Sequence, residues 1–192
     1  MVRSLVLDFW ENKLRGEACL LPSLEYCKPS FMSLASPHPI WTTARGNPHE
    51  VAKSIQQARF LSGRYRTEYL LRHWSDNPMG FCLAAEQCKT TVEDIKHILL
   101  YCPAYCEDRQ KLVSFWLKKT NIEVHKLVLG ALSNTSEYLL QFILDCSVLP
   151  TVITASQMYG NEILCDLFLL TRTWCFVIHR QRMRKLGRWN FQ

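Results

Sequence analysis

The sequence lacks the short motifs that mark the common catalytic classes. None of its seven glycines lies in a Gly-x-x-x-x-Gly-Lys phosphate-binding loop or in a Gly-x-Ser-x-Gly nucleophile elbow. There is no pair of adjacent aspartates, the arrangement with which polymerases hold two metal ions. The six histidines are scattered, and none recurs with carboxylates at a hydrolytic spacing. We therefore expect a protein that is not an enzyme and has no small-molecule substrate.

Long apolar runs are also missing. The most apolar stretch, residues 163–178, contains Asp166 and Arg172, so it is too short and too charged to span a bilayer. The first residues reach Asp8 before an uninterrupted apolar stretch forms, which predicts that there is no signal peptide. Cysteine, by contrast, is abundant, with nine residues. An odd cysteine count without secretion signals indicates thiols or metal ligands in an intracellular protein, nuclear or cytoplasmic, that does not contact membranes.

The charge is modest in total but uneven in distribution. The composition, 48% hydrophobic and 21% charged, is typical of a folded protein. The net charge is +3 over residues 50–74, −3 over residues 75–178 and +5 over the last fourteen residues. Two basic surfaces therefore flank a mildly acidic body, which favours an anionic partner. The alternative is that these cations only solvate the faces of helices.

The apolar pattern has the period of helices, and no period-two alternation recurs, so we expect an all-α fold, a small helical bundle. Prolines predict an irregular connector after the first helix. Asn47, Pro48 and Glu50 open a well-marked helix that ends at Ser62-Gly63, with Val51, Ile55 and Ala58 on its apolar face. The other helices are expected over residues 5–21, 67–74, 104–118, 135–146 and 161–185. The chain divides into residues 1–47, helix and connector; 48–118, a helical segment that includes the cysteine-containing residues 82–102; and 119–192, a helical segment with a basic tail.

Four residues have the composition and spacing of a structural zinc site. They are Cys82, Cys88, His97 and Cys102, separated by five, eight and four residues. Zinc prefers four sulfur or nitrogen donors in a tetrahedron, and closed cysteine and histidine sets define structural sites. The sequence therefore predicts that residues 82–102 hold one zinc ion as cofactor.

The local pattern around these residues supports the site but leaves alternatives open. Thr90 and Glu93 have the spacing of a capping box, which predicts a helix that carries His97 and ends before Pro103. Cys106, one helical turn beyond Cys102, or more weakly His73, can replace a ligand. In the other interpretation the four residues are unrelated and the cysteines are buried as small apolar groups. The segment is not basic, so the zinc is expected to shape the module while neighbouring residues contact nucleic acid.

The first basic segment, residues 59–74, interleaves cations with aromatic side chains. The second, the last fourteen residues, continues a helix. In the first, arginines are expected to hold phosphates, and Tyr65, Tyr69 or Trp74 to stack on unpaired bases. In the second, the cations also suit the negative end of a helix. The alternative places the aromatic rings in the core and the arginines in surface pairs. The candidate nucleic-acid-binding residues are Arg59, Arg64, Tyr65, Arg66, Arg72, Arg180, Arg182, Arg184 and Lys185.

Several of these stretches resemble one family. Residues 37–41, residues 59–67, the Cys-Cys-His-Cys pattern with His97-Ile-Leu and Cys102-Pro, the following Arg109 and residues 169–176 together resemble the C-terminal region of LINE-type (non-LTR) retrotransposon polyproteins. In that family a Cys-Cys-His-Cys knuckle follows the reverse transcriptase domain. The resemblance implies binding of RNA or target DNA during target-primed reverse transcription. The family's palm aspartates have no counterpart here, so polymerase activity is not expected.

The sequence thus predicts a non-catalytic, zinc-binding module whose partner is RNA or DNA, with single-stranded or structured RNA favoured. One alternative is a zinc-stabilised domain that serves as a scaffold for protein partners. A third is a non-functional relic of a retroelement, which predicts poor folding even with metal present.

Overall fold

The computed structural model of the chain describes residues 2–28 and 36–188. Over these residues the fold is all-α and has no β-strand, which confirms the predicted fold class. The longer helices are α1 (Val2–Cys19), α3 (Pro48–Leu61), α5 (Cys106–Lys119), α6 (Ile122–Leu132), α7 (Ser136–Leu144), α8 (Pro150–Tyr159) and α9 (Glu162–Lys185). The short helical segments are η1 (Pro22–Cys27), α2 (Pro39–Thr42), α4 (Glu68–Leu71), η3 (Glu86–Cys88), η4 (His97–Tyr101), η5 (Pro103–Tyr105) and η6 (Cys146–Val148).

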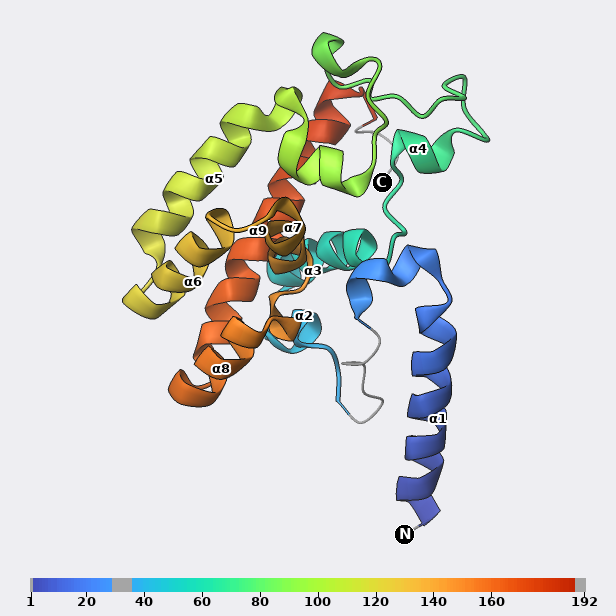
Figure 1. Cartoon of the computed structure of the whole chain (residues 1–192). Coiled ribbons are helices and arrows are strands. Elements are labelled where there is room, and N and C mark those ends of the chain that lie inside the picture. Colours follow the sequence, from blue (N-terminus) through green and yellow to red (C-terminus); the bar gives the residue numbers. More distant parts are fainter. Residues whose placement is uncertain (1, 29–35, 189–192) are drawn as a thin grey trace.

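The long helix α9 is the axis of the bundle. Figure 1 shows it passing behind α7 through the whole body, and α3, α5, α7 and α8 all contact it. The segment between α4 and α5 forms a lobe beside the C-terminal turns of α9. Helix α1 projects away from the bundle at the opposite end (Figure 1).

Large aromatic side chains fill the centre of the bundle. Trp116 of α5 lies 4.8 Å from Trp174 of α9 and 6.3 Å from Phe142 of α7, measured between ring centroids, and all three are buried. Rings of this size contribute most of the apolar area in a core. The buried cluster continues from Ile40 to Ile178, so it includes residues from all three predicted segments of the chain.

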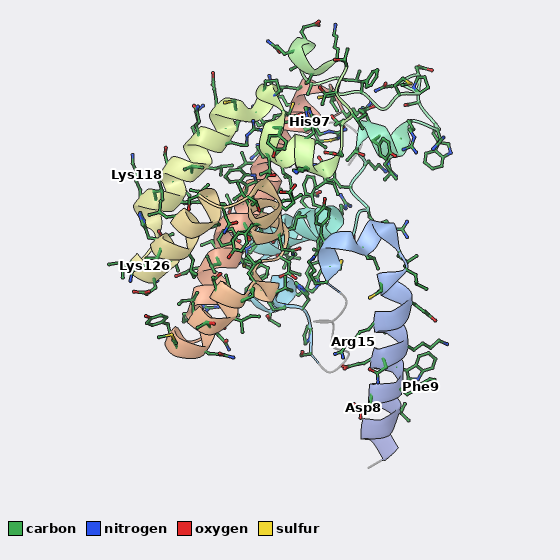
Figure 2. The ribbon with its side chains drawn as sticks, in the orientation of Figure 1. Asp8, Phe9, Arg15, His97, Lys118 and Lys126 are labelled. Atoms are coloured by element: carbon green, nitrogen blue, oxygen red, sulfur yellow. The ribbon has the colours of Figure 1, made fainter. Side chains whose placement is uncertain are left out.

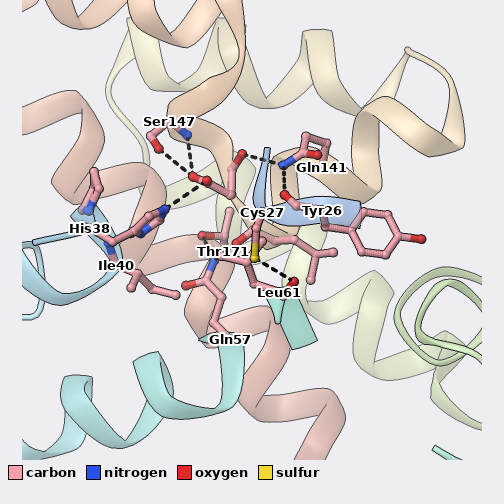
Figure 3. Close-up of polar contacts among 12 residues, drawn as sticks. Tyr26, Cys27, His38, Ile40, Gln57, Leu61, Gln141, Ser147 and Thr171 are labelled. Carbon is pink, nitrogen blue, oxygen red and sulfur yellow. Dashed lines mark hydrogen bonds and ion pairs between the residues drawn. The ribbon is translucent and has the colours of Figure 1, made fainter. Parts of the chain in front are cut away.

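The described parts of the predicted connector, residues 22–28 and 36–47, are more regular than the prolines predicted, and residues 29–35 lie outside the described residues. His38 caps α2 by accepting a hydrogen bond from the backbone N–H of Ile40, and its other ring nitrogen lies 3.1 Å from the buried carboxylate of Asp145. Gln141 donates to the carbonyl of Tyr26 (Figure 3). These polar contacts anchor the connector to the corner after α7, because a buried carboxylate or amide is stable only with partners.

Helix α3 begins and ends where expected, but its buried face is different. Asn47 caps it by accepting from the N–H of His49, and Gly63 follows the end with φ +64°. Ile55, predicted to face the core, is exposed, whereas Ser54 and Gln57 are fully buried. Gln57 donates to the carbonyls of residues 143 and 144 and to the hydroxyl of residue 171 (Figure 3). Apolarity misassigned the face because two polar side chains have partners in the core.

Among the described residues, the last half of the chain has two more of the longer helices than predicted. Asn121 opens α6 by accepting from the N–H of Val124, and Pro150 stands at the start of α8. The cap of α7 is Thr135, whose hydroxyl accepts from the N–H of Tyr138, so the helix begins at Ser136, one residue after the predicted start at residue 135. These starts follow the ordinary rules for caps and for proline at the first helical position.

Candidate metal centre and arginine groove

The backbone at the start of the lobe between α4 and α5 requires a glycine, Gly80. Gly80 has φ +64°, and a Cβ atom there would lie 2.5 Å from the Cα atom of Tyr69 in α4. Only glycine permits this approach. The chain then forms an isolated antiparallel bridge between Phe81 and Val92, which places Cys82 at the start of a closed loop.

Residues 91–94 form the backbone strip that holds three of the predicted ligands in place. The carbonyl of Thr91 accepts from the N–H of Cys82 at 2.9 Å, and the N–H of Thr91 donates to the carbonyl of Cys88 at 2.9 Å. Asp94 accepts from the N–H of His97 at 2.6 Å. The predicted capping box is therefore wrong, since Asp94, not Thr90 with Glu93, opens the helical turn that carries His97.

The fourth ligand is set by an unusual turn. The N–H of Cys102 donates to the carbonyl of His97, five residues back, at 2.7 Å. This π-type turn, η4, brings His97 and Cys102 to the same side of the backbone. The carbonyl of Cys102 also accepts from the guanidinium of Arg109 at 2.8 Å, which ties the end of the turn to α5.

The four side chains converge at one buried point. The sulfur atoms of Cys82, Cys88 and Cys102 and a ring nitrogen of His97 all lie within 4.8 Å of one another, and all four residues are buried. The sulfur of Cys102 is 3.7 Å from that of Cys82 and 3.9 Å from that of Cys88. Figure 2 shows His97 in the lobe, at the end of the molecule away from the free end of α1. The four predicted ligands therefore form a group that could bind a metal ion.

The geometry fits a tetrahedral ion. With metal–sulfur bonds of about 2.3 Å, the sulfur atoms of a tetrahedral site lie about 3.8 Å apart. The two measured separations bracket that value. In addition, the Nε2 atom of His97 is buried and has no hydrogen-bond partner among the described residues. A buried nitrogen without a partner is costly, and a metal bond would satisfy it.

The three thiols differ in acidity because they share hydrogen bonds. The contact with the Cys102 thiol lowers the pKa of Cys82 to about 3, while the same contact raises the pKa of Cys102. Burial raises the pKa of Cys88. One sulfur is therefore readily a thiolate, and a divalent cation can replace the protons on the other two.

The two reserve ligands lie outside this group. Cys106 is exposed on α5, where its sulfur accepts a hydrogen bond from Gln110. His73 is exposed beside Trp74. The buried set is complete without either residue.

The two basic segments, far apart in the sequence, meet in one groove. It lies between α3, the segment after α3 and the last turns of α9, and its volume is about 1110 Å³. No carboxylate is among the described residues that line it, and apolar side chains including Ile55, Leu71 and Phe176 contribute to its wall. Its arginines are Arg59, Arg64, Arg66, Arg180, Arg182 and Arg188. We call this cavity the arginine groove.

Two predicted nucleic-acid-binding residues have structural roles instead. Arg182 is 2% exposed, and its guanidinium lies 2.6 Å from the carboxylate of Glu93 and 3.3 Å from that of Glu68. Tyr65 is also buried. Its ring stacks on Phe60 at 3.7 Å, so it has no free face for a base. The prediction that these two side chains bind nucleic acid is wrong because each is already enclosed by the fold.

The buried network around Arg182 continues to the floor of the groove. The hydroxyl of Tyr65 lies 3.1 Å from the Nδ1 atom of His179, and desolvation lowers the pKa of His179 to about 4. Burial raises the pKa of Tyr65 to about 12. Both groups are therefore neutral near pH 7, so the groove's positive charge comes from its arginines.

The remaining candidates fall into three sets. Arg59, Arg64, Arg66 and Arg180 are exposed and line the groove. Arg184 and Lys185 are exposed on α9 but do not line it. Arg72 lies with its guanidinium 3.8 Å from the ring of Tyr69 and donates to that residue's carbonyl.

Glu68 and Glu93 were not recognised from the sequence. They are 25 positions apart, and the N–H of Glu68 donates to the carboxylate of Glu93 at 2.8 Å. Both are fully buried against Arg182. Nothing local distinguishes them from surface acids, because their burial depends on how α4 and the lobe pack on α9.

No protein-family model, curated protein or solved structure matches this chain. Among the described helices, none is long and apolar enough to cross a membrane. The structure thus defines an all-α protein with a buried Cys-Cys-His-Cys group beside an arginine-lined groove.

Proposed function

We propose that this protein is a non-catalytic module, organised by one structural zinc ion, that binds RNA or single-stranded DNA in the arginine groove. The observation that carries the proposal is the groove itself, which is lined by arginines from two distant segments and by no carboxylate among the described residues. Phosphate contacts by arginine provide most of the affinity for nucleic acid. The apolar part of the wall favours a strand with unpaired bases, whose faces can pack on apolar side chains.

Zinc is the metal that the donor set favours. Three thiolates and one imidazole form a closed structural site, whereas catalytic zinc sites keep one position for water. The four residues are buried, so the site holds the lobe together and has no position for a substrate. The resulting charge of the bound site is about −1, so phosphate contacts fall to the groove and not to the knuckle.

The metal is tested by Cys88→Ser, with Cys106→Ser as the matched control. We expect one zinc ion per wild-type chain, one in the exposed Cys106 variant, and a large loss of zinc affinity in the Cys88 variant. Zinc-dependent helicity in circular dichroism would also argue against a non-functional relic. Equal zinc retention in both variants would reject the site.

Nucleic-acid binding is tested by its dependence on salt. Four exposed groove arginines predict a slope of log affinity against log salt of about −3 for a single strand. The double variant Arg64→Gln, Arg66→Gln should reduce that slope to about −1.5. The control is Lys118→Gln, Lys126→Gln, which removes two exposed cations that point outward from α5 and α6 (Figure 2). No measurable affinity at low salt would reject the function.

A descent from the C-terminal region of LINE-type retrotransposon proteins is part of this proposal. It is supported by the sequence pattern given above, in which Arg109 follows the last ligand. The guanidinium of Arg109 donates a hydrogen bond to the carbonyl of Cys102, so this arginine stabilises the backbone beside the last ligand.

A scaffold role is the second candidate, and one observation favours it. Helix α1 exposes Val6, Phe9, Trp10 and Leu14, and Figure 2 shows Phe9 pointing away from the bundle. Exposed apolar clusters of this kind mark protein-interaction sites. If α1 serves only protein partners, Phe9→Ser with Trp10→Ser should leave the affinity for RNA unchanged.

A further inference from the structure

The metal centre and the arginine groove share a buried ion pair. Arg182 lines the groove, yet its guanidinium is bonded to Glu93, which belongs to the same four-residue strip that holds the ligands. On either side of Glu93 along this strip, Thr91 bonds the backbone of Cys82 and Cys88, and Asp94 bonds that of His97. The position of Glu93 therefore depends on the loop that the metal closes.

The second carboxylate completes the connection. Glu68 contacts Arg182 and also pairs with Arg188, another groove residue. Its helix, α4, is held to the lobe because the N–H of Tyr69 donates to the carbonyl of Glu93 and the α-carbon of Gly80 packs on Tyr69. The floor of the groove is thus fastened to the lobe at two carboxylates.

We propose that metal binding at Cys82, Cys88, His97 and Cys102 is coupled to nucleic-acid binding in the arginine groove, with Glu93 as the positioning residue that connects the two sites. With metal bound, Glu93 holds Arg182 in the floor, and the exposed arginines above it keep their arrangement. Without metal, the strip loses its ligand contacts and Arg182 loses its fixed partner, so the groove binds phosphates less well. This inference rests on the proposed function.

The coupling is reciprocal by thermodynamic necessity. If zinc raises the affinity for a strand by a given factor, the strand raises the affinity for zinc by the same factor. Couplings between sites typically range from about 5-fold to 150-fold. The measurement can therefore be made on the folded, zinc-loaded protein, by competition with a chelator in the presence and absence of the strand.

The experiment compares the zinc-loaded wild type with Glu93→Gln and Glu137→Gln, using a labelled single strand of about 12 nucleotides as probe. Glu137 is the matched control because it pairs with Lys96, beside the ligand His97, but does not touch the groove. We expect at least about fivefold coupling in the wild type and in the Glu137 variant, and roughly twofold or less in the Glu93 variant.

The outcomes separate the two proposals. A wild type that binds both zinc and the strand without coupling, or a Glu93 variant that keeps the full coupling, overturns the inference and leaves the function standing. A wild type that binds zinc but no strand overturns both. Loss of coupling in the Glu137 variant as well would also overturn the role of Glu93, because a general loosening of the lobe would then explain the effect.

Discussion

Replacing Arg182 with methionine tests the central feature of the buried network. The substitution keeps most of the apolar stem and removes the guanidinium that lies 2.6 Å from Glu93 and 3.3 Å from Glu68. Both carboxylates are fully buried. If Arg182 were an exposed residue that only binds phosphates, the change would have little effect on the free energy of unfolding.

The loss in free energy of unfolding depends on which buried carboxylate is left without a partner. Removing one partner of a buried ion pair typically costs about 3–5 kcal/mol, because the other charge is left uncompensated. Glu68 keeps its pair with Arg188, so the uncompensated charge is that of Glu93. We therefore expect a loss near the lower limit, about 3 kcal/mol.

The loss should also depend on pH. Burial already raises the pKa of Glu93, and Arg182 opposes that rise. Without the arginine, the pKa of Glu93 in the folded state rises further above its unfolded value. A carboxyl group with a raised folded pKa destabilises the fold most above that pKa, and this cost shrinks as pH falls below the folded pKa and disappears below the unfolded pKa. The defect of the variant should therefore shrink as pH falls from 7 towards 5.

The assay is urea unfolding in excess zinc, followed by far-ultraviolet circular dichroism. The control is Arg184→Met, which removes the same charge from an exposed position on α9 and should cost less than about 0.5 kcal/mol. A cost below about 1 kcal/mol for the Arg182 variant, or a defect that grows at low pH, would refute the reasoning.

Two further predictions concern the lobe and the groove floor. Gly80→Ala should destabilise the fold by about 3 kcal/mol or more, because a Cβ atom would lie 2.5 Å from the backbone of Tyr69. Gly160→Ala, also at positive φ but with nothing within 4 Å, should cost only about 1 kcal/mol. Thermal unfolding of both variants measures this difference. The pKa of His179 is lowered from 6.5 to about 4, so the unfolded chain binds a proton in that range that the folded protein does not, and stability should fall by about 2 kcal/mol as pH drops from 6.5 to 4. His179→Gln should lose this part of the pH dependence, and a variant with the same profile as the wild type would contradict the assignment.

Much of the local structure was predictable from the sequence. The start of α3 at Asn47-Pro48 and its end at Gly63 follow from side chains within a few positions of each boundary. The metal-site candidates were predictable for a similar reason, because cysteine and histidine at short spacings are typical of structural zinc sites. The missed helices α6 and α8 had ordinary signals in Asn121 and Pro150.

The errors share one physical cause. The apolar pattern predicts Ile55 on the buried face of α3 and does not predict Gln57 there, although the fold supplies three acceptors for the amide of Gln57. Tyr65 and Arg182 were assigned to nucleic acid, although the fold encloses both. Whether a polar side chain is buried depends on partners from distant segments, and no local pattern contains that information.

The sequence by itself determined which residues can bind a metal, where most helices begin, and that positive charge gathers in two segments. Only the tertiary structure decided that these two segments line one groove, and that Glu68 and Glu93 lie buried beneath it. The reason is that caps and ligand spacings act over a few residues, whereas the groove depends on how α3, α4 and the lobe pack against α9.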